Sequence, residues 1–195
     1  MQYNDNDYQI SKEKTIFYYD YHQQRYLVYS DDMGENWQTV QRPQNTTIEC
    51  IQFIDSKIGY MLEFEDVAMG TAFGKISKTT DGGQSWKDIN YGIGEGTDKT
   101  FKTSSKIKFV NENVGFLTMP QTSGESSYLY ITKDGGATFN KLELFESDIY
   151  DYYNLPTEES GILKLKITQG SDGDYNGGDF VTYISNDYGE TWNPA

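Results

Sequence analysis

The chain has 195 residues, with 30 acidic against 16 basic side chains and a formal net charge of −14. This length suits one domain, or one array of repeats, with a sizeable core. The negative charge argues against nucleic-acid binding, because affinity for phosphate polymers depends on dense Lys and Arg. The sequence holds no run of about 18 apolar residues, so we expect no membrane insertion.

The composition favours β-structure. The chain contains 17 Tyr, 10 Phe, 3 Trp and 19 Gly. Aromatic side chains favour strands, and Gly, Asn and Asp suit tight turns. No stretch shows sustained apolar spacing of about 3.6 residues, so almost no helix is expected. The only cysteine, Cys50, leaves no partner for an internal disulfide or a cysteine-based zinc site.

The first predicted repeat unit covers residues 14–45. Apolar runs at 16–19 and 26–29 flank a turn at 20–24, and a third short strand follows at 38–41. The polar residues that precede the unit carry no periodic signal, so this unit is predicted to lack its first strand.

Two fuller units cover residues 46–92 and 100–145. Both show four short strands in the same order, at 48–54, 58–64, 74–79 and 87–89, and at 107–110, 114–119, 128–132 and 141–144. Between the first two strands lies a shared motif, Phe53–Tyr60 or Phe109–Phe116, 56 residues apart. The centres of these motifs are turn residues between apolar runs, which predicts a β-hairpin. Each unit is therefore predicted to be a four-stranded antiparallel meander.

The fourth predicted unit covers residues 147–195. Strands are expected at 149–153, 161–168 and 180–185, and the sequence stops three residues after Trp192, so a fourth strand is predicted to be missing. Two interpretations stay open for the incomplete end units. In one, the N-terminal segment completes the last sheet and closes a small ring; in the other, the chain is part of a longer array.

One short pattern recurs in every unit: Ser or Thr, then Asp two residues on, Gly two further on, and Trp or Phe three beyond. Its copies are Ser30-Asp32-Gly34-Trp37, Thr79-Asp81-Gly83-Trp86, Thr132-Asp134-Gly136-Phe139 and Ser185-Asp187-Gly189-Trp192. Successive aspartates are 49, 53 and 53 residues apart. A fixed period of about 50 residues indicates a repeat architecture.

The pattern is explained by a folded turn. An Asp side chain can bind backbone N–H groups one or two residues on, and the Ser or Thr hydroxyl can satisfy another backbone group. Gly supplies a positive φ or a close approach that a Cβ would block. The aromatic residue begins the next strand, where its burial contributes about 2–3 kcal/mol. None of these roles requires a substrate.

The four copies resemble the Asp-box, or BNR repeat, of sialidases, sortilin-type receptors, xyloglucanases and the photosystem II stability factor. The resemblance covers roughly residues 16–192, and the third copy departs from it only in having Phe139 for Trp. With the two hairpin motifs, the chain is most similar to the stability-factor group. The resemblance implies an all-β propeller, whole or partial, of about four four-stranded blades in one domain. It also implies that the boxes are structural and lie away from the central site.

The resemblance to sialidases also implies a test for catalysis. That family holds the substrate carboxylate with three arginines, whose planar guanidinium groups suit bidentate contacts. This chain has two, Arg25 and Arg42, so a complete sialidase site is excluded. Other glycosidases need two carboxylates about 5–9 Å apart, and no acidic pair stands out in a motif. A glycoside hydrolase, or a fragment of one, stays the alternative.

The stretch 172–179 is the candidate metal site. It matches the opening half of a calcium loop, with oxygen-bearing residues at positions one, three and five and Gly at six. The candidate ligands are Asp172, Asp174, Asn176 and Asp179. The closing Glu is absent, since position twelve is Tyr183. The alternative is an acidic hairpin loop without a cation; no other cofactor is expected.

Two tyrosine clusters are candidate contact surfaces, 18–21 and 150–153, where flat rings could meet a sugar or a protein. Packing between blades is the alternative role for them. We therefore expect a non-catalytic binding or scaffold module for a protein or glycan. Because Asp-box proteins are mostly exported, the resemblance implies an extracellular or cell-envelope location. Met1 is followed by a polar run, so no signal peptide is visible.

Overall fold

The computed structural model describes residues 8–10, 14–22, 24–42, 46–94, 99–121, 126–144, 147, 149–170 and 179–195. All regular elements in these ranges are β-strands, which confirms the all-β prediction. Over the same ranges, no helix is long and apolar enough to cross a membrane. The chain forms two compact parts, of which the first ends at Phe101 and the second begins at Lys102.

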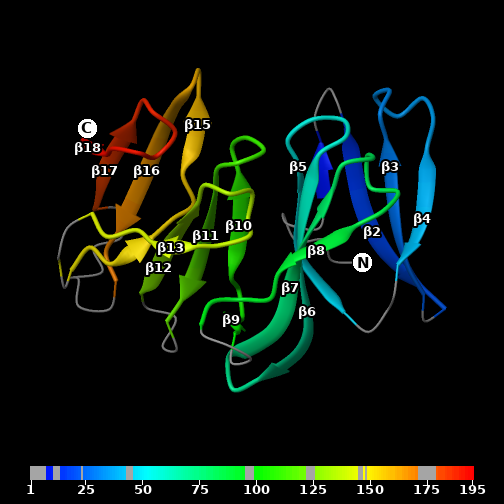
Figure 1. Ribbon diagram of the computed structural model, residues 1–195, viewed down its shortest axis with the longest axis horizontal. Helices are drawn as coiled ribbons and strands as arrows, with labels where there is room; N and C mark the ends of the chain where they lie inside the picture. The colour runs from blue at the N-terminus through cyan, green and yellow to red at the C-terminus, as the bar shows by residue number, and fades with distance from the viewer. Residues whose placement is uncertain are drawn as a thin grey trace. The chain divides into compact units, whose positions relative to one another are not determined.

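The first part contains two antiparallel meanders (Figure 1). Meander 1 consists of β1 (Tyr8–Ile10), β2 (Thr15–Tyr21), β3 (Gln24–Ser30) and β4 (Gln38–Arg42). Meander 2 consists of β5 (Thr47–Phe53), β6 (Gly59–Ala68), β7 (Thr71–Thr79) and β8 (Lys87–Asn90), and β9 (Phe101–Lys102) pairs with β7. Their facing strands share one core cluster, in which Leu27, Phe53 and Met61 are buried.

The second part contains two further meanders joined into one sheet. Meander 3 consists of β10 (Lys106–Phe109), β11 (Gly115–Pro120), β12 (Ser127–Thr132) and β13 (Asn140–Lys141). Meander 4 consists of β14 (Tyr152–Tyr153) and β15 (Thr157–Glu159), both paired with β16 (Ile162–Thr168), then β17 (Phe180–Ser185) and β18 (Asn193–Pro194). The join is a single parallel pairing of Ser127 with Tyr152.

Both end meanders contain a strand that the sequence analysis predicted to be missing, so those two predictions were wrong. The first is β1, which pairs with β2, and the Gln9 amide also binds the backbone N–H and C=O of Phe53 at 2.5 and 2.8 Å. The last is β18, which pairs with β17. Each is too short to leave a periodic signal. Since β1 pairs with β2, the N-terminal strand completes the first sheet and not the last.

Each Asp pattern folds into the same hydrogen-bonded turn. In the first, Ser30 Oγ accepts from Gly34 N at 2.8 Å and donates to Asp32 Oδ1 at 2.7 Å. The Asp32 carboxylate accepts from the backbone N–H and the side-chain amide of Asn36, at 2.9 and 2.7 Å. The other turns repeat these bonds, with Ser85, Thr138 and Thr191 in the place of Asn36.

The turn differs from its prediction in how far the Asp side chain reaches. The positive φ of the pattern glycines is confirmed, from 88° at Gly189 to 95° at Gly83. These left-handed residues fold the chain back, so the carboxylate meets the N–H four residues on and not one or two. The residue just before the aromatic therefore belongs to the turn as well, as a hydroxyl or amide donor.

Two of the turns also dock on the hairpin of their own meander. Gly82 N donates to the carbonyl of Lys57, and Gly135 N to that of Asn113, both at 2.9 Å. A Cβ on Gly82 would lie 3.2 Å from the Ser56 carbonyl oxygen. Glycine at this position therefore avoids a tight contact with that carbonyl and adopts its positive φ without strain.

The two hairpins follow their prediction. Phe53 pairs with Gly59, and Phe109 with Gly115, across the turn of each. A Cβ on Gly59 would lie 2.8 Å from the Phe53 ring, so the glycine makes room for the aromatic ring. The Asp55 carboxylate accepts from the turn N–H groups of Lys57 and Ile58, as turn chemistry predicts.

Lys14 is a buried cation that ties meander 1 to meander 2. Its side chain is fully buried, and Nζ lies 2.6 Å from Asp31 Oδ1. The ammonium also lies 4.1 Å from the ring centroid of Tyr29 and 4.6 Å from that of Phe53. Ion pairing and two ring faces together stabilise the buried charge.

Acid should weaken the four turns together. The hydrogen bond from Asn36 N lowers the pKa of Asp32 from 3.8 to about 2, and bonds from Ser85 and Thr191 do the same for Asp81 and Asp187. A carboxyl whose folded pKa is depressed adds stability above its unfolded pKa and loses it as pH falls. We expect the melting temperature to drop between about pH 4 and pH 2, measured by circular dichroism.

Asp32→Asn is the matched variant for this acid effect. It keeps the shape of the side chain and removes the titrating proton, so the variant should have a shallower pH dependence over the same range. An unchanged slope would show that the turn carboxylates do not govern acid stability.

Removing the Lys14 side chain should destabilise the first part. Deleting one partner of a fully buried ion pair costs about 3–5 kcal/mol; we expect about 2 kcal/mol for Lys14→Ala, since Asp31 keeps contact with water. Lys14→Met, which keeps the packing, should lose less. Urea unfolding of both variants measures the difference, and equal losses would mean that the charge contributes nothing.

Candidate ligand-binding pocket

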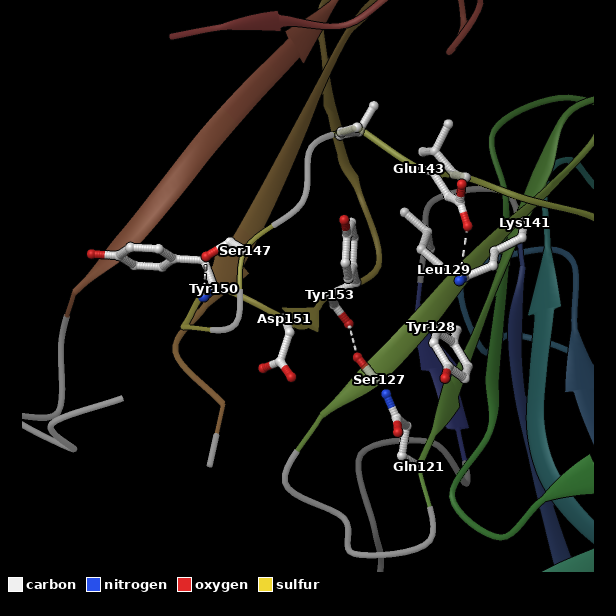
Figure 2. Close-up of a pocket in the computed structure, with 12 residues that line it drawn as sticks. Gln121, Ser127, Tyr128, Leu129, Lys141, Glu143, Ser147, Tyr150, Asp151 and Tyr153 are labelled. Atoms are coloured by element: carbon white, nitrogen blue, oxygen red, sulfur yellow. Dashed lines mark hydrogen bonds and ion pairs between the residues drawn. The ribbon is translucent and has the colours of Figure 1, made fainter. Parts of the chain in front are cut away.

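A pocket opens where the outer edge of β12 changes its partner. β13 pairs with Tyr130 and Ile131, whereas β14 pairs with Ser127 at the start of the strand. Tyr128 lies between the two pairings. The pocket there has a volume of about 470 Å³ (Figure 2), within the range of small-molecule sites.

Three tyrosines, Tyr128, Tyr150 and Tyr153, line the pocket. They come from β12, from the segment before β14, and from β14 itself. Burial raises the pKa of the Tyr153 phenol above 10.0, so this ring is neutral at physiological pH. Lys141 Nζ lies 4.4 Å from the ring centroid of Tyr128. The walls therefore contain both aromatic rings and phenol groups.

The charged groups of the pocket are Lys141, Glu143 and Asp151. Lys141 Nζ lies 2.9 Å from Glu143 Oε1, and this hydrogen bond raises the pKa of Lys141. Lys141 is thus charged at neutral pH. Figure 2 shows the Asp151 carboxylate directed away from this ion pair. One cation and two carboxylates give the lining a formal charge of −1.

Backbone and serine contacts hold the pocket walls in place. Ser127 is buried; its N–H donates to the Asp151 carbonyl at 3.1 Å and its hydroxyl to the Tyr153 carbonyl at 2.8 Å. Tyr150 N donates to Ser147 Oγ at 3.0 Å. These bonds position Asp151 and both tyrosines through backbone groups, and the rings of Tyr150 and Tyr153 also pack against the core of the second part.

The structure brings only part of one predicted tyrosine cluster into this pocket. Tyr150 and Tyr153 line it, whereas the hydroxyl of Tyr18, from the other cluster, binds the Ile48 carbonyl at 3.2 Å. Sequence reasoning missed Tyr128, Lys141 and Asp151. Their only signal was an aromatic or charged residue inside or beside a short strand, which many surface positions share.

Both arginines of the chain are engaged in one polar cluster. Arg42 Nη2 lies 3.0 Å from Glu63 Oε2, and Thr46 Oγ1 donates to Glu63 Oε1 at 2.9 Å. Arg25 is buried and donates to the Thr46 carbonyl. Glu63 is also buried, and such a charge needs these partners. The cluster holds β4, β6 and the segment between β4 and β5 together.

The predicted calcium ligands Asp172, Asp174 and Asn176 lie outside the described residues. Asp179 is described, and it is exposed directly before β17. Among the residues that the structure describes, no group of three or more His, Cys, Asp or Glu side chains could hold a metal ion. The calcium loop therefore stays a prediction from the sequence.

Calcium binding has a direct test. If the loop binds Ca²⁺, millimolar calcium should raise the melting temperature, because a ligand that binds the folded state stabilises it. EDTA should reverse the rise, and Asp172→Ala/Asp174→Ala should abolish it. Magnesium is the control cation. An unchanged melting temperature in the original protein would mean that the loop binds no calcium.

Comparisons with known proteins agree with the turn geometry. The family model for the BNR/Asp-box repeat matches residues 28–39 and 183–194, which hold the first and fourth turns. A search of curated proteins finds no match.

Three solved structures share the fold, each at 16% sequence identity. The Niastella koreensis GH74 enzyme has a TM-score of 0.54 over 93% of this chain and 28% of its own. The Hadza microbial sialidase Hz136 has a TM-score of 0.52 over 87% of this chain and 35% of its own. YCF48 bound to D1 peptide has a TM-score of 0.51 over 94% of this chain and 52% of its own. This chain therefore spans at most about half of their length. The chain therefore contains BNR/Asp-box repeats at two of its four turns, within an all-β fold of antiparallel sheets.

Proposed function

We propose that this chain is a non-catalytic Asp-box module that binds a partner through the pocket beside β12, and that this partner is a protein rather than a glycan. The observation that carries the proposal is the set of three tyrosines around a cavity of about 470 Å³. Tyrosine supplies a large contact area with a polar end, which suits partner recognition. The four meanders would serve as blades of a propeller, or of a segment of one, outside the cell or in its envelope.

Two features support binding over sialidase chemistry. The only arginines are held by Glu63 and the Thr46 carbonyl, so neither is available for a substrate carboxylate. The turn aspartates are likewise engaged in hydrogen bonds within their own turns.

A protein partner is favoured over a glycan by one comparison. The YCF48 structure, which shares this fold, contains a bound peptide. Its identity to this chain is 16%, so the peptide supports the class of partner and not its sequence.

Glycoside hydrolysis is the second candidate, because Glu143 and Asp151 both line the pocket. Two carboxylates are the minimum set for that chemistry, and a GH74 enzyme shares the fold. Glu143 is paired with Lys141 at 2.9 Å, which favours a structural role for it over acid catalysis.

Assays for turnover and binding separate the two candidates. A binding module should hydrolyse none of a panel of aryl glycosides and polysaccharides. It should be retained on a peptide array, and Tyr150→Ala should reduce retention at least about five-fold, the loss expected for one buried interface tyrosine. Tyr91→Ala, at an exposed tyrosine of the first part, is the matched control. Saturable hydrolysis that Asp151→Asn or Glu143→Gln abolishes would instead establish a glycosidase.

A further inference from the structure

Strand β2 of meander 1 carries apolar side chains on both of its sides. Ile16 and Tyr18 face the core cluster that meanders 1 and 2 share. Phe17 and Tyr19, which alternate with them along the strand, face the opposite side. An antiparallel sheet that has water on one side normally alternates apolar with polar residues. Meander 1 therefore has a second side that is suited to burial.

We call this second side the outer face of meander 1. The strand registers place six apolar residues on it: Ile10, Phe17, Tyr19, Tyr21, Tyr26 and Val28. The other described strand positions on this face hold Thr, Ser or Gln, so none of them is charged. The chain as a whole carries −14. An uncharged face on so acidic a chain marks a surface that meets another apolar surface.

Aromatic rings on the outer face lie close together. The Trp37 ring lies 5.7 Å from the Phe17 ring, and Tyr19 stacks on Tyr26 at 5.3 Å. Ile10 is 72% exposed and Trp37 is 48% exposed. The face thus combines a large apolar area with rings already held in place by their neighbours, which lowers the entropy cost of burying them.

The counterparts of Trp37 in two other turns lie against a preceding meander. The Arg42 guanidinium, from meander 1, lies 5.8 Å from the Trp86 ring centroid. Trp192 lies 6.2 Å from the Phe116 ring of meander 3. Trp37 has the same place in its own turn, and its ring stays exposed. A sheet laid on the outer face would give Trp37 the packing that its two counterparts already have.

We propose that a second copy of this chain covers the outer face, in a symmetric dimer in which the two outer faces pack against each other. Such a contact uses the same patch on both chains, so it closes at two copies. Sheets pack face to face at a distance of about 10 Å, with their side chains interdigitating. Two chains of like charge meet with least repulsion where both surfaces are uncharged. The inference goes beyond the proposed function and does not depend on it.

Meander 4 does not offer a matching surface for a head-to-tail contact. Along β16, lysines alternate with the leucines of the core cluster, so Lys164 and Lys166 lie on its outer side. Lys164 pairs with Glu159 at 2.6 Å, and Lys166 Nζ lies 3.8 Å from the Phe180 ring centroid. Burying these ammonium groups against an uncharged aromatic face would cost their hydration. The outer face of meander 1 is therefore the better partner for itself.

The mass of the whole chain in solution tests the proposal. Sedimentation equilibrium from about 1 µM to about 300 µM should show the average mass rising to twice that of one chain and no further. Salt screens the repulsion between the two acidic copies. The dissociation constant should therefore fall at least about three-fold between about 0.05 M and about 0.5 M salt.

Three variants locate the contact. Ile10→Asp places a charge at a largely exposed position of the outer face, and Tyr19→Asp places one at its centre. Each should raise the dissociation constant at least about ten-fold, because the two-fold axis buries the new charge in both copies. Phe180→Asp makes the same change of net charge at a half-exposed ring on meander 4, so it is the matched control and should leave dimerisation unchanged. Melting temperatures check folding; Ile10→Asp decides the result if Tyr19→Asp unfolds.

A single-chain mass at every concentration and salt would overturn the proposal, as would a dimer that Ile10→Asp does not weaken. Species that grow beyond two copies, or a loss of association in Phe180→Asp, would indicate a head-to-tail contact and overturn it too. Association that weakens with salt would do the same. The proposed function is judged separately, because its pocket lies in the second part of the chain and its assay depends on Tyr150.

Discussion

Tight turns between strands must satisfy their own backbone N–H groups, because they have no neighbouring strand to pair with. In this chain, two side-chain oxygens per turn meet that need. The hydroxyl before the Asp accepts the glycine N–H, and the carboxylate accepts the N–H of the residue before the aromatic. Since the same turn connects the last two strands of every meander, the arrangement of all four depends on this one set of bonds.

The third turn also accounts for the pocket. It leads into β13, which has two residues and pairs only with the last half of β12. The first residue of β12 is then paired with β14 from the next meander. The exchange of partners along one edge leaves space beside Tyr128, so the pocket forms at the place where the structural repeat is interrupted.

The repeated features of the fold were predictable from the sequence, and the unrepeated ones were not. Four copies of the Asp pattern predict the positive φ of Gly83, and two copies of the hairpin motif predict the two hairpins that the structure shows. By contrast, β1 and β18 are held by backbone pairing, and β1 also by the Gln9 amide. Backbone pairing leaves no pattern in the residue types. Tyr128 and Asp151 come together only through the pairing of β12 with β14, a contact that local spacing does not encode.

The position between the Asp and the Gly of each turn divides the four repeats into two kinds. Gly82 and Gly135 face a hairpin carbonyl, whereas Met33 and Tyr188 adopt the same left-handed conformation, each with φ 58°, and expose their side chains. Left-handed backbone disfavours both of these residues. The hydrogen bonds of the turn offset the conformational cost of the left-handed residue, so this position can carry a projecting side chain without loss of the turn. In a chain of such repeats it is a position where surface chemistry can vary independently of the scaffold.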